Sequence, residues 1–364
     1  MVLLYVLGIV VFLNCVYFLV FSKFSFSKTL DPISSENHAI SLIVCAKNEA
    51  ENLKNNIPLW LAQAYPNFEI ILINDASSDD TLEIMEQFAA ENDCIQIVNV
   101  KNNEAFWGNK KYALTLGIKR AKNKRMLFTD ADCKPASNNW LALMAGSFTE
   151  EKELVLGYGA YEKAPGLLNS LIRYETLLTA VQYFSYAKVG MPYMGVGRNL
   201  AYTSNLYYAN NGFMSHIKIP SGDDDLFVNE AATSKNTALC YSENAFTYSL
   251  PKKTWKSWFI QKKRHVSTAK LYKPTHKFLL GTYYFLNLLF WIVAAASFVF
   301  LDWKIPAILI SFRFLVQWIT IGKAASKLKE NNLIPFLPFL DLFLVFIQMS
   351  IFISNSVSKQ TKWN

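Results

Sequence analysis

Four apolar stretches constrain the possible folds of this chain more than any other feature. Residues 2–22 and 278–301 contain no Asp, Glu, Lys or Arg, whereas 305–321 and 333–354 contain one charge each. A helix rises about 1.5 Å per residue, so stretches of this length can cross a hydrocarbon core of about 30 Å. The sequence therefore predicts one N-terminal and about three C-terminal transmembrane helices, the latter within 278–356, with a soluble domain between them.

The first stretch is predicted to remain as an anchor over residues 1–23. A secretory signal peptide is the alternative, but no basic residue precedes the apolar run and no small-x-small cleavage site follows it. Lys23 and Lys28 follow the first span, and residues 323–329 add three lysines between the third and fourth spans. Because cytoplasmic loops are enriched in lysine and arginine, both flanks are expected inside the cell. This predicts a multi-pass protein of the cell inner (plasma) membrane with residues 23–277 in the cytoplasm.

The positive charge of the chain, which has a net charge of +8, is concentrated just before the second span. Residues 245–301 contain nine Lys or Arg and no Asp or Glu. We expect a basic interfacial segment at 251–277 that adheres to anionic headgroups. Nucleic acid is not an expected partner, because the basic run adjoins a transmembrane stretch and no recognition motif accompanies it. The five cysteines show no C-x-x-C spacing, which predicts neither a zinc site nor a disulfide framework and fits a reducing compartment.

Short β-branched runs alternate with helical patterns between the first and second spans. The runs cover 40–45, 69–74, 95–100 and 125–129, and the helical patterns cover 49–63, 78–91 and 109–122. This order predicts an α/β fold with a parallel sheet and helices on both faces, and Ser77 or Ser78 is expected to cap the second helix. A dinucleotide-binding enzyme is the rival for this topology. Its glycine-rich turn after the first strand is replaced here by "CAKNEAENL", which contains no glycine.

Polar side chains follow three of the predicted strands. Asn48 and Glu49 follow the first strand, Asp75 follows the second, and Asp130 and Asp132 follow the fourth. In a parallel sheet the carboxyl ends of the strands form one edge, where ligands bind, so these side chains are expected to lie together. Two carboxylates one residue apart can share a divalent cation, and an all-oxygen site suits Mg²⁺ or Mn²⁺. Such a cation would neutralise a diphosphate bound through its oxygens.

Four segments resemble motifs of the inverting family 2 glycosyltransferases, and a fifth resembles a motif of the membrane-bound bacterial members. The four are "SLIVCAKNEAENL", "ILINDASSDDT", "GNKKYALTLGI" and "FTDADC". The resemblance covers about residues 38–270 and implies a GT-A-type, Rossmann-like domain at 36–250. It divides that domain into a donor half at 36–135 and an acceptor half at 136–250.

The resemblance also implies roles for the strand-end residues. Asp75 would meet the nucleotide base of a sugar donor, and Lys110 would lie near the donor phosphates. Asp130 and Asp132 would hold Mg²⁺ or Mn²⁺. The full set implied for donor binding in this part of the chain is Asn48, Glu49, Asp75, Lys110 and Asp130.

Two further motifs point to the acceptor and to a catalytic base. Gly197 and Asn199 match the family's acceptor-side element G-x-N-x-A-Y-R, although Thr203 and Ser204 stand where its basic residues are expected. The stretch "SGDDDLFVNE" resembles the motif that holds the base. Alignment through its glycine makes Asp224 the base, Asp223 its neighbour and Asp225 a helix-start residue, whereas a shift of one position would make Asp225 the base.

The fifth segment, "QKKRHVSTAKLY", resembles the Q-x-x-R-W motif of the membrane-bound members. Gln261 and Arg264 match it and imply contacts with the donor diphosphate, for which a guanidinium is well suited. His265 stands where the family has tryptophan and is assigned to the acceptor side. The alternative for Arg264 is an ordinary cation of the basic flank.

The resemblance implies a metal-dependent, inverting transfer of a sugar from a nucleoside-diphosphate sugar, expected to be a UDP-sugar. The acceptor is expected to be a membrane lipid or a lipid-linked glycan, because the basic, Trp-rich segment leads from the acceptor elements into the membrane. A processive polysaccharide synthase is the alternative within the class. A non-catalytic nucleotide-binding membrane scaffold is the alternative from another class.

The two charges inside the last apolar stretches are costly there unless they are paired. Arg313 lies eight residues before the end of the third span, and Asp341 lies eight residues after the start of the fourth. At about 1.5 Å per residue, both charges are about 12 Å from the same membrane face. The sequence therefore predicts a contact between Arg313 and Asp341. The alternative is that Arg313 extends to water or lipid phosphate while Asp341 faces a polar entrance.

Overall fold

The structure is a computed structural model that describes residues 1–28, 38–101 and 110–357. Its contacts divide the described chain into two units. The helical unit consists of residues 1–28, 163–191 and 252–357, and the sheet unit consists of 38–101, 110–162 and 192–251.

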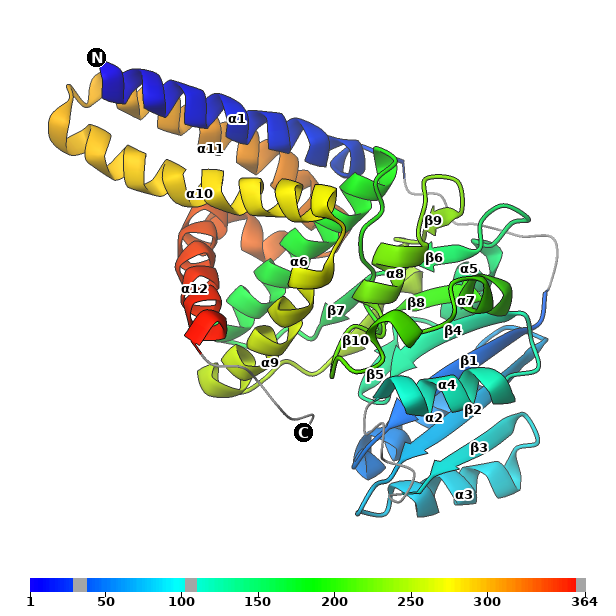
Figure 1. The fold of residues 1–364 in the computed structure, drawn as a ribbon. Helices are drawn as coiled ribbons and strands as arrows, with labels where there is room; N and C mark the ends of the chain where they lie inside the picture. Colours follow the sequence, from blue (N-terminus) through cyan, green and yellow to red (C-terminus); the bar gives the residue numbers. More distant parts are fainter. Residues whose placement is uncertain (29–37, 102–109, 358–364) are drawn as a thin grey trace. The chain divides into compact units, whose positions relative to one another are not determined.

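The sheet unit is built on a seven-stranded sheet with the order β3-β2-β1-β4-β8-β6-β9 (Figure 1). Its strands are β1 (Ile40–Ala46), β2 (Phe68–Asp75), β3 (Ile95–Val100), β4 (Arg125–Asp130), β6 (Leu154–Leu156), β8 (Leu200–Thr203) and β9 (Thr237–Leu239). The first four strands are parallel, as predicted, but β8 is antiparallel to both β4 and β6. The four strands predicted from the sequence are thus parallel to one another, and β8, which was not predicted, adds an antiparallel strand to a mixed sheet. An apolar run reads the same in either chain direction, so its sequence alone does not fix strand direction.

Helices cover both faces of this sheet, as predicted. They are α2 (Ala50–Leu61), α3 (Thr81–Glu91), α4 (Lys110–Arg120), α5 (Trp140–Gly146), α7 (Ser204–Ala209) and α8 (Asp225–Ala231). Leu42 and Val44 of β1 pack in one core cluster with residues of α2, α3 and α5. Ile43 points to the opposite face. There a Cβ at Gly117 of α4 would lie 2.2 Å from Ile73, so glycine lets α4 approach the sheet closely.

The helix after β2 begins later than predicted. α3 starts at Thr81, and Asp80 precedes it, so neither Ser77 nor Ser78 caps it. Instead the Ser77 hydroxyl accepts a hydrogen bond from the Asn48 amide at 3.1 Å, and the Ser78 amide donates to Asn48 Oδ1 at 2.8 Å. The two serines therefore join the turn after β2 to the turn after β1.

A second, three-stranded sheet lies beside the acidic turn after β4. It consists of β5 (Cys133–Pro135), β10 (Thr247–Ser249) and β7 (Gly159–Tyr161) in the order β5-β10-β7. β5 begins three residues after the end of β4, so the chain turns sharply at Ala131 and Asp132. The pairing of β5 with β10 holds the chain in place directly after this turn.

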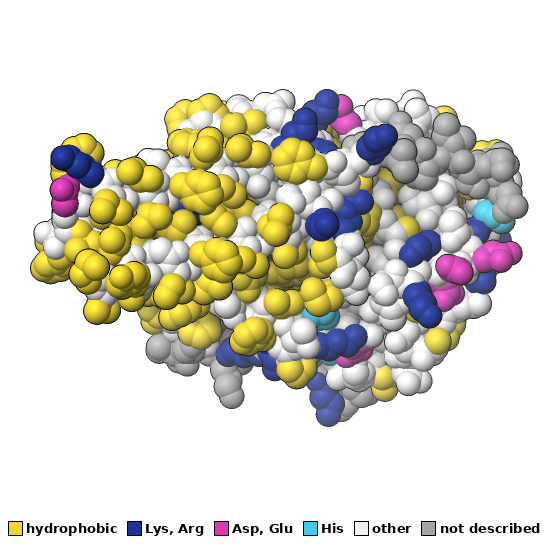
Figure 2. Space-filling model, turned by 90° about the horizontal axis from the view of Figure 1, so that it is seen from above, with side chains coloured by type: hydrophobic (Ala, Val, Ile, Leu, Met, Phe, Trp, Pro, Cys, Tyr) yellow, Lys and Arg dark blue, Asp and Glu magenta, His cyan; other side chains and the backbone are white. Residues whose placement is uncertain are grey.

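The helical unit consists mainly of α1 (Val2–Ser25), α6 (Leu167–Lys188), α9 (Trp255–Thr268), α10 (Pro274–Phe300), α11 (Lys304–Lys327) and α12 (Leu337–Val357). Four helical segments are long and apolar enough to cross a membrane: Val2–Ser25, Pro274–Phe300, Lys304–Lys327 and Asn331–Asn355. They match the four predicted spans. Figure 2 shows that hydrophobic side chains gather over the surface of this unit. Phe12, Phe285 and Ile292 are among those more than half exposed.

α6 belongs to the helical unit, although the predicted acceptor half at 136–250 includes it. Its Ser185 hydroxyl donates to the Phe21 carbonyl of α1, and its Arg173 pairs with Glu330. Most of the helix is buried, so the amphipathic pattern reflects packing among other helices. The predicted domain boundaries therefore do not coincide with the two structural units.

The predicted contact between Arg313 and Asp341 is confirmed. Arg313 Nη2 lies 3.1 Å from Asp341 Oδ2, and the two side chains are 0% and 1% exposed. Asn287 of α10 completes the contact, since its amide nitrogen donates to Asp341 and its oxygen accepts from Arg313. Three helices are thus joined by one buried polar cluster. The alternative that the two charges face water or lipid does not hold in this structure.

Candidate active site

The polar residues after β1 and β2 lie at the same edge of the sheet, as predicted. Ala46 pairs with Asn74, and Cys45 pairs with Asp130, so the ends of β1, β2 and β4 are level. Asn48 has a positive φ of 57°, a conformation that asparagine adopts more readily than most residues. The Glu49 amide donates to the Thr81 hydroxyl at 2.8 Å. Asn48 and Glu49 therefore hold the two turns together, and their contact with a donor stays a prediction.

Asp75 ends β2 at this edge. Burial raises the pKa of its carboxyl, and the charges of Lys47 and Lys110 partly offset that effect. A partly buried carboxylate at the end of a strand can accept a hydrogen bond from a nucleotide base. The role predicted for Asp75 fits this position and remains a prediction.

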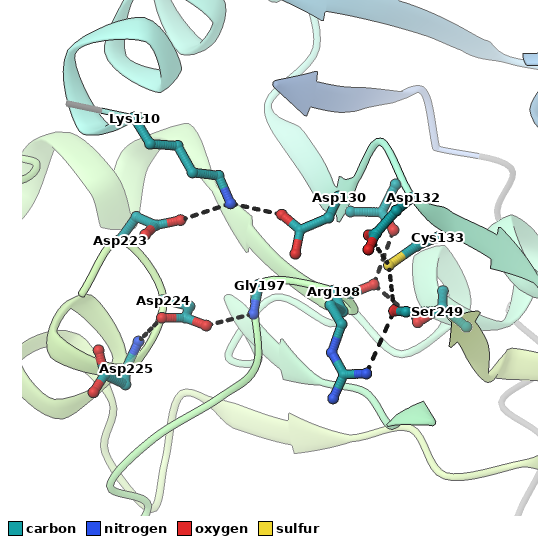
Figure 3. Close-up of polar contacts among 12 residues, drawn as sticks. Lys110, Asp130, Asp132, Cys133, Gly197, Arg198, Asp223, Asp224, Asp225 and Ser249 are labelled. Atoms are coloured by element: carbon teal, nitrogen blue, oxygen red, sulfur yellow. Dashed lines mark hydrogen bonds and ion pairs between the residues drawn. The ribbon is translucent and has the colours of Figure 1, made fainter. Parts of the chain in front are cut away.

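Lys110 connects Asp130, at the end of β4, to Asp223, which lies just before α8. Its ammonium is 2.6 Å from Asp130 Oδ1 and 3.2 Å from Asp223 Oδ2 (Figure 3). Burial by itself would lower the pKa of Lys110, but the two carboxylates outweigh it and hold the pKa well above its usual value. The lysine is therefore charged at neutral pH. Its place in the first turn of α4, where the helix dipole disfavours a cation, is offset by the same two acids.

A group able to hold a cation lies in the turn between β4 and β5. Among the described residues, Asp130, Asp132 and Cys133 bring one ligand atom each within 4.8 Å of one another. Burial, followed by the charge of Asp132, raises the pKa of the Cys133 thiol well above its usual value. The thiol is therefore a weak ligand, and the two carboxylates are the effective donors. Hard oxygen donors fit Mg²⁺ or Mn²⁺ better than a thiophilic metal.

Asp224 is held by two backbone amides. Its Oδ2 accepts from the Gly197 amide at 2.7 Å, and its Oδ1 accepts from the Asp225 amide at 2.7 Å (Figure 3). A Cβ at position 197 would lie 3.3 Å from Oδ2, so glycine allows this close approach. Burial, followed by the charges of Asp223 and Asp225, raises the pKa of Asp224 to about 7. This value is suited to a general base at neutral pH.

Asp225 has the different role that was expected for it. It is the first residue of α8, its side chain is 7% exposed, and its Oδ1 accepts from the Leu226 amide at 2.8 Å. It therefore binds a backbone amide in the first turn of α8, whose N-cap is Asp224. The assignment of the base to Asp224 and of the helix start to Asp225 agrees with this geometry.

A cavity brings the candidate residues together. Its polar wall is formed by Lys110, Thr129, Asp130, Gly197, Asp223 and Asp224, and its apolar wall by Ile43, Leu114, Phe128, Leu200 and Tyr202. The residue proposed as a base and a residue proposed as a metal ligand thus line the same space. The apolar wall keeps bulk water away from one side and strengthens the electrostatic interactions inside.

Asn199 does not line this cavity. The side chain is fully buried, and its nitrogen donates to the carbonyls of Tyr158 and Ala245 at 3.0 and 2.7 Å. Its oxygen accepts from the Trp140 indole at 3.0 Å. Asn199 therefore holds the loop that carries Gly197. Gly197 of the same motif lines the cavity, whereas a contact of Asn199 with the acceptor stays a prediction.

Arg198 follows Gly197 in the same loop and was not among the residues predicted for the site. Its guanidinium stacks over the Tyr161 ring at 4.2 Å and donates to the Ala160 carbonyl at 3.0 Å. Its Nη1 also lies 3.4 Å from the Ser249 hydroxyl (Figure 3). In the sequence Arg198 is a basic residue at the unspecified position of the G-x-N element, and this does not indicate where its side chain lies.

Gln261, Arg264 and His265 lie on α9, in the helical unit. The cavity is described within the sheet unit alone. Their predicted contacts with the donor diphosphate and the acceptor therefore stay predictions.

Comparisons with known proteins agree with the motifs. Residues 41–191 match the family model described as Glycosyl transferase family 2. Over 142 residues the chain is 30% identical to an uncharacterized glycosyltransferase of Haemophilus influenzae, which is 38% of this chain and 42% of that protein. Over 110 residues it is 34% identical to poly-beta-1,6-N-acetyl-D-glucosamine synthase of Staphylococcus aureus, which is 30% of this chain and 26% of that protein. The matches thus span less than half the length of either relative.

A solved structure resembles the whole chain. It is a mannosyltransferase from Pyrobaculum calidifontis in complex with GDP-Man and Mn²⁺, and it aligns with 99% of this chain and 99% of that chain. The TM-score is 0.64 and the sequence identity is 17%. At this identity the likeness is evidence for a shared fold, and the predicted GT-A fold is confirmed.

Proposed function

We propose that this chain, whose residues 41–191 match glycosyl transferase family 2 and which has the GT-A fold, transfers a sugar from a UDP-sugar to a membrane lipid or lipid-linked glycan. One observation carries the proposal. The cavity is lined both by Asp224, whose pKa is raised to about 7, and by Asp130 of the carboxylate pair. The residue proposed as the proton acceptor and one of the carboxylates proposed to hold the metal thus line one space.

The proposed reaction is a single displacement. Asp224 takes the proton from an acceptor hydroxyl as the hydroxyl oxygen forms a bond to the anomeric carbon, and the bond from that carbon to the diphosphate breaks. The configuration at the anomeric carbon inverts, because the attack and departure occur on opposite faces. The Gly197 amide orients the carboxylate for this step. Asp223 takes no proton and instead holds Lys110 at the cavity wall.

Asp130 and Asp132 would hold Mg²⁺ or Mn²⁺, whose positive charge would offset that of the leaving diphosphate. Lys110 adds a fixed positive charge beside Asp130. On the donor side, Asp75 would accept a hydrogen bond from the nucleotide base. Gln261 and Arg264 would contact the diphosphate once the donor is bound.

The membrane setting follows from the four apolar helices. We place the protein in the cell inner (plasma) membrane as a multi-pass protein, with the sheet unit in the cytoplasm, where nucleotide sugars are made. The segment at 251–277 carries nine cations and no acidic residue, so it would adhere to anionic headgroups. A lipid-borne acceptor would then be held at the level of the membrane surface.

A processive polysaccharide synthase is the second candidate function. The similarity to the poly-beta-1,6-N-acetyl-D-glucosamine synthase of S. aureus over 110 residues favours it. His265 stands where the motif of membrane-bound members has tryptophan, which argues against it. Product length separates the two, because a single transfer adds one sugar and a processive enzyme makes a polymer.

Donor binding tests the proposed metal site. We expect a nucleoside-diphosphate sugar to bind in the presence of Mn²⁺ and to be released by excess EDTA. Asp132→Asn should weaken this binding by about tenfold or more, since losing even a supporting group of a metal site has an effect of about 10–100-fold. Isothermal titration calorimetry measures it. Asp93→Asn, in an exposed aspartate just before β3, is the control and should leave the affinity unchanged. Equal affinity with and without EDTA would remove the metal from the account.

A further inference from the structure

Lys111, the neighbour of Lys110 on α4, is almost completely buried. None of its hydrogen bonds in the described chain is to a carboxylate. Its side chain is 1% exposed. The ammonium donates to the backbone carbonyls of His216, Ile219 and Ser221 at 2.8, 2.8 and 2.7 Å. An ammonium has three donors, so this arrangement uses all of them. Three acceptors from one short loop meet at a single side chain.

This loop leads directly into the acidic motif. Ser221 is followed by Gly222, which has a positive φ of 97°, and then by Asp223 and Asp224. A Cβ at Gly222 would lie 2.5 Å from Leu226, so the turn is tightly closed against α8. The position of Ser221 therefore determines where the chain enters the turn that carries the base.

The loop is also fastened to α8 on its other side. The Ser215 hydroxyl donates to both carboxylate oxygens of Glu230 at 2.7 and 2.8 Å. Glu230 lies in α8, which begins at Asp225. Ser215 and Glu230 thus link the loop to α8, and Lys111 links the same loop to α4.

Two consecutive lysines of α4 therefore act on the same segment in different ways. Lys110 contacts Asp130 and Asp223 in the cavity, whereas Lys111 holds the backbone that precedes Asp223. Successive residues of a helix point about 100° apart, so one short turn can supply both contacts. Removing an ammonium from water costs free energy. The three carbonyls offset this cost only while the loop stays in this position.

We propose that Lys111 is a positioning residue that sets the place of Asp224 relative to Asp130. This rests on the proposed function, because the distance between base and diphosphate site matters only for transfer. Displacement of a reacting group by about 1 Å can reduce a rate by about 100-fold. Lys111 touches neither substrate nor metal in this account, and it acts through the loop.

Lys111→Met tests the proposal, because methionine keeps the length and loses the donors. We expect kcat to fall by about 10–100-fold while the donor KM stays within about twofold. Amides of residues 216–224 should exchange hydrogen for deuterium faster than in wild type. Lys111→Arg keeps charged donors and should retain more of kcat than Lys111→Met. If Lys111→Met does not fold, the same measurements are made on Lys111→Arg.

Lys152→Met is the matched control. Lys152 also donates to two backbone carbonyls, those of Ser234 and Lys235, in the same unit and away from the cavity lining. It should change neither kcat nor exchange in 216–224. Wild-type kcat and exchange in Lys111→Met would overturn the proposal, as would a uniform loss of kcat, donor affinity and thermal stability. Hydrogen–deuterium exchange and donor binding do not need turnover. They therefore test whether Lys111 holds the loop even if no sugar is transferred and the proposed function fails.

Discussion

Replacing Asp224 by asparagine is expected to reduce turnover by about 10²–10⁴-fold while donor affinity stays near wild type. Asparagine has the size and shape of aspartate, and its oxygen can still accept from the Gly197 amide, although its nitrogen cannot accept from the Asp225 amide. It cannot take the proton of an acceptor hydroxyl. Steady-state kinetics with a saturating donor measure kcat, and calorimetry measures donor affinity separately.

Asp225→Asn is the matched control for this prediction. The Asp225 side chain binds a backbone amide in the first turn of α8, so its replacement should have a small effect on turnover. A large loss in Asp225→Asn with none in Asp224→Asn would mean that the assignment of the base is displaced by one residue.

The pH profile of the wild-type enzyme gives a second readout of the same group. Because burial and the neighbouring aspartates raise the pKa of Asp224 to about 7, the carboxyl is mostly protonated below that pH. Below about pH 7, kcat/KM should therefore fall about tenfold per pH unit, and above it kcat/KM should level off. The residual activity of Asp224→Asn should lack this limb. A rising limb that persists unchanged in the variant would assign the titration to another group.

Breaking the buried ion pair of the helical unit is expected to have the second large effect. Arg313→Leu and Asp341→Leu should each destabilise the protein by about 3–5 kcal/mol, because each leaves a buried charge without its partner. Asn287 contacts both side chains, so it would lose one partner in either variant. Thermal or denaturant unfolding in detergent or bicelles measures the change.

The double variant distinguishes pairing from two independent effects. Arg313→Leu with Asp341→Leu removes both charges, and much of the single loss should be recovered. The expected coupling is large because the two groups are in direct contact at 3.1 Å and almost fully buried. Strict additivity of the two single changes would show that the contact does not stabilise the helices.

Features that depend on local pattern could be predicted from the sequence. The first four strands begin and end within about a residue of the predicted runs, because β-branched residues buried on both faces leave little ambiguity. The contact between Arg313 and Asp341 followed from helix rise, since both charges lie eight residues from the adjoining ends of their predicted spans. The level ends of β1, β2 and β4 followed from the geometry of parallel strands.

Features that depend on which segments meet in space could not be predicted in this way. The direction of β8 is set by its partners and not by its residues. α6 has a mixed apolar and polar pattern whether it lies on a soluble domain or among other helices. Lys111 directly follows Lys110, and nothing in the sequence indicates that it donates to three carbonyls more than a hundred positions away.

Sugar transfer from a panel of labelled nucleotide sugars tests the central claim most directly. The purified protein is incubated with Mn²⁺ and membranes that supply acceptor, and label in the lipid fraction is measured together with the nucleoside diphosphate released. We expect one UDP-sugar to label the lipid fraction, with one nucleoside diphosphate released per sugar transferred, and Asp224→Asn to do neither. Nucleotide-sugar binding without any transfer from the whole panel would contradict the account and favour a non-catalytic scaffold.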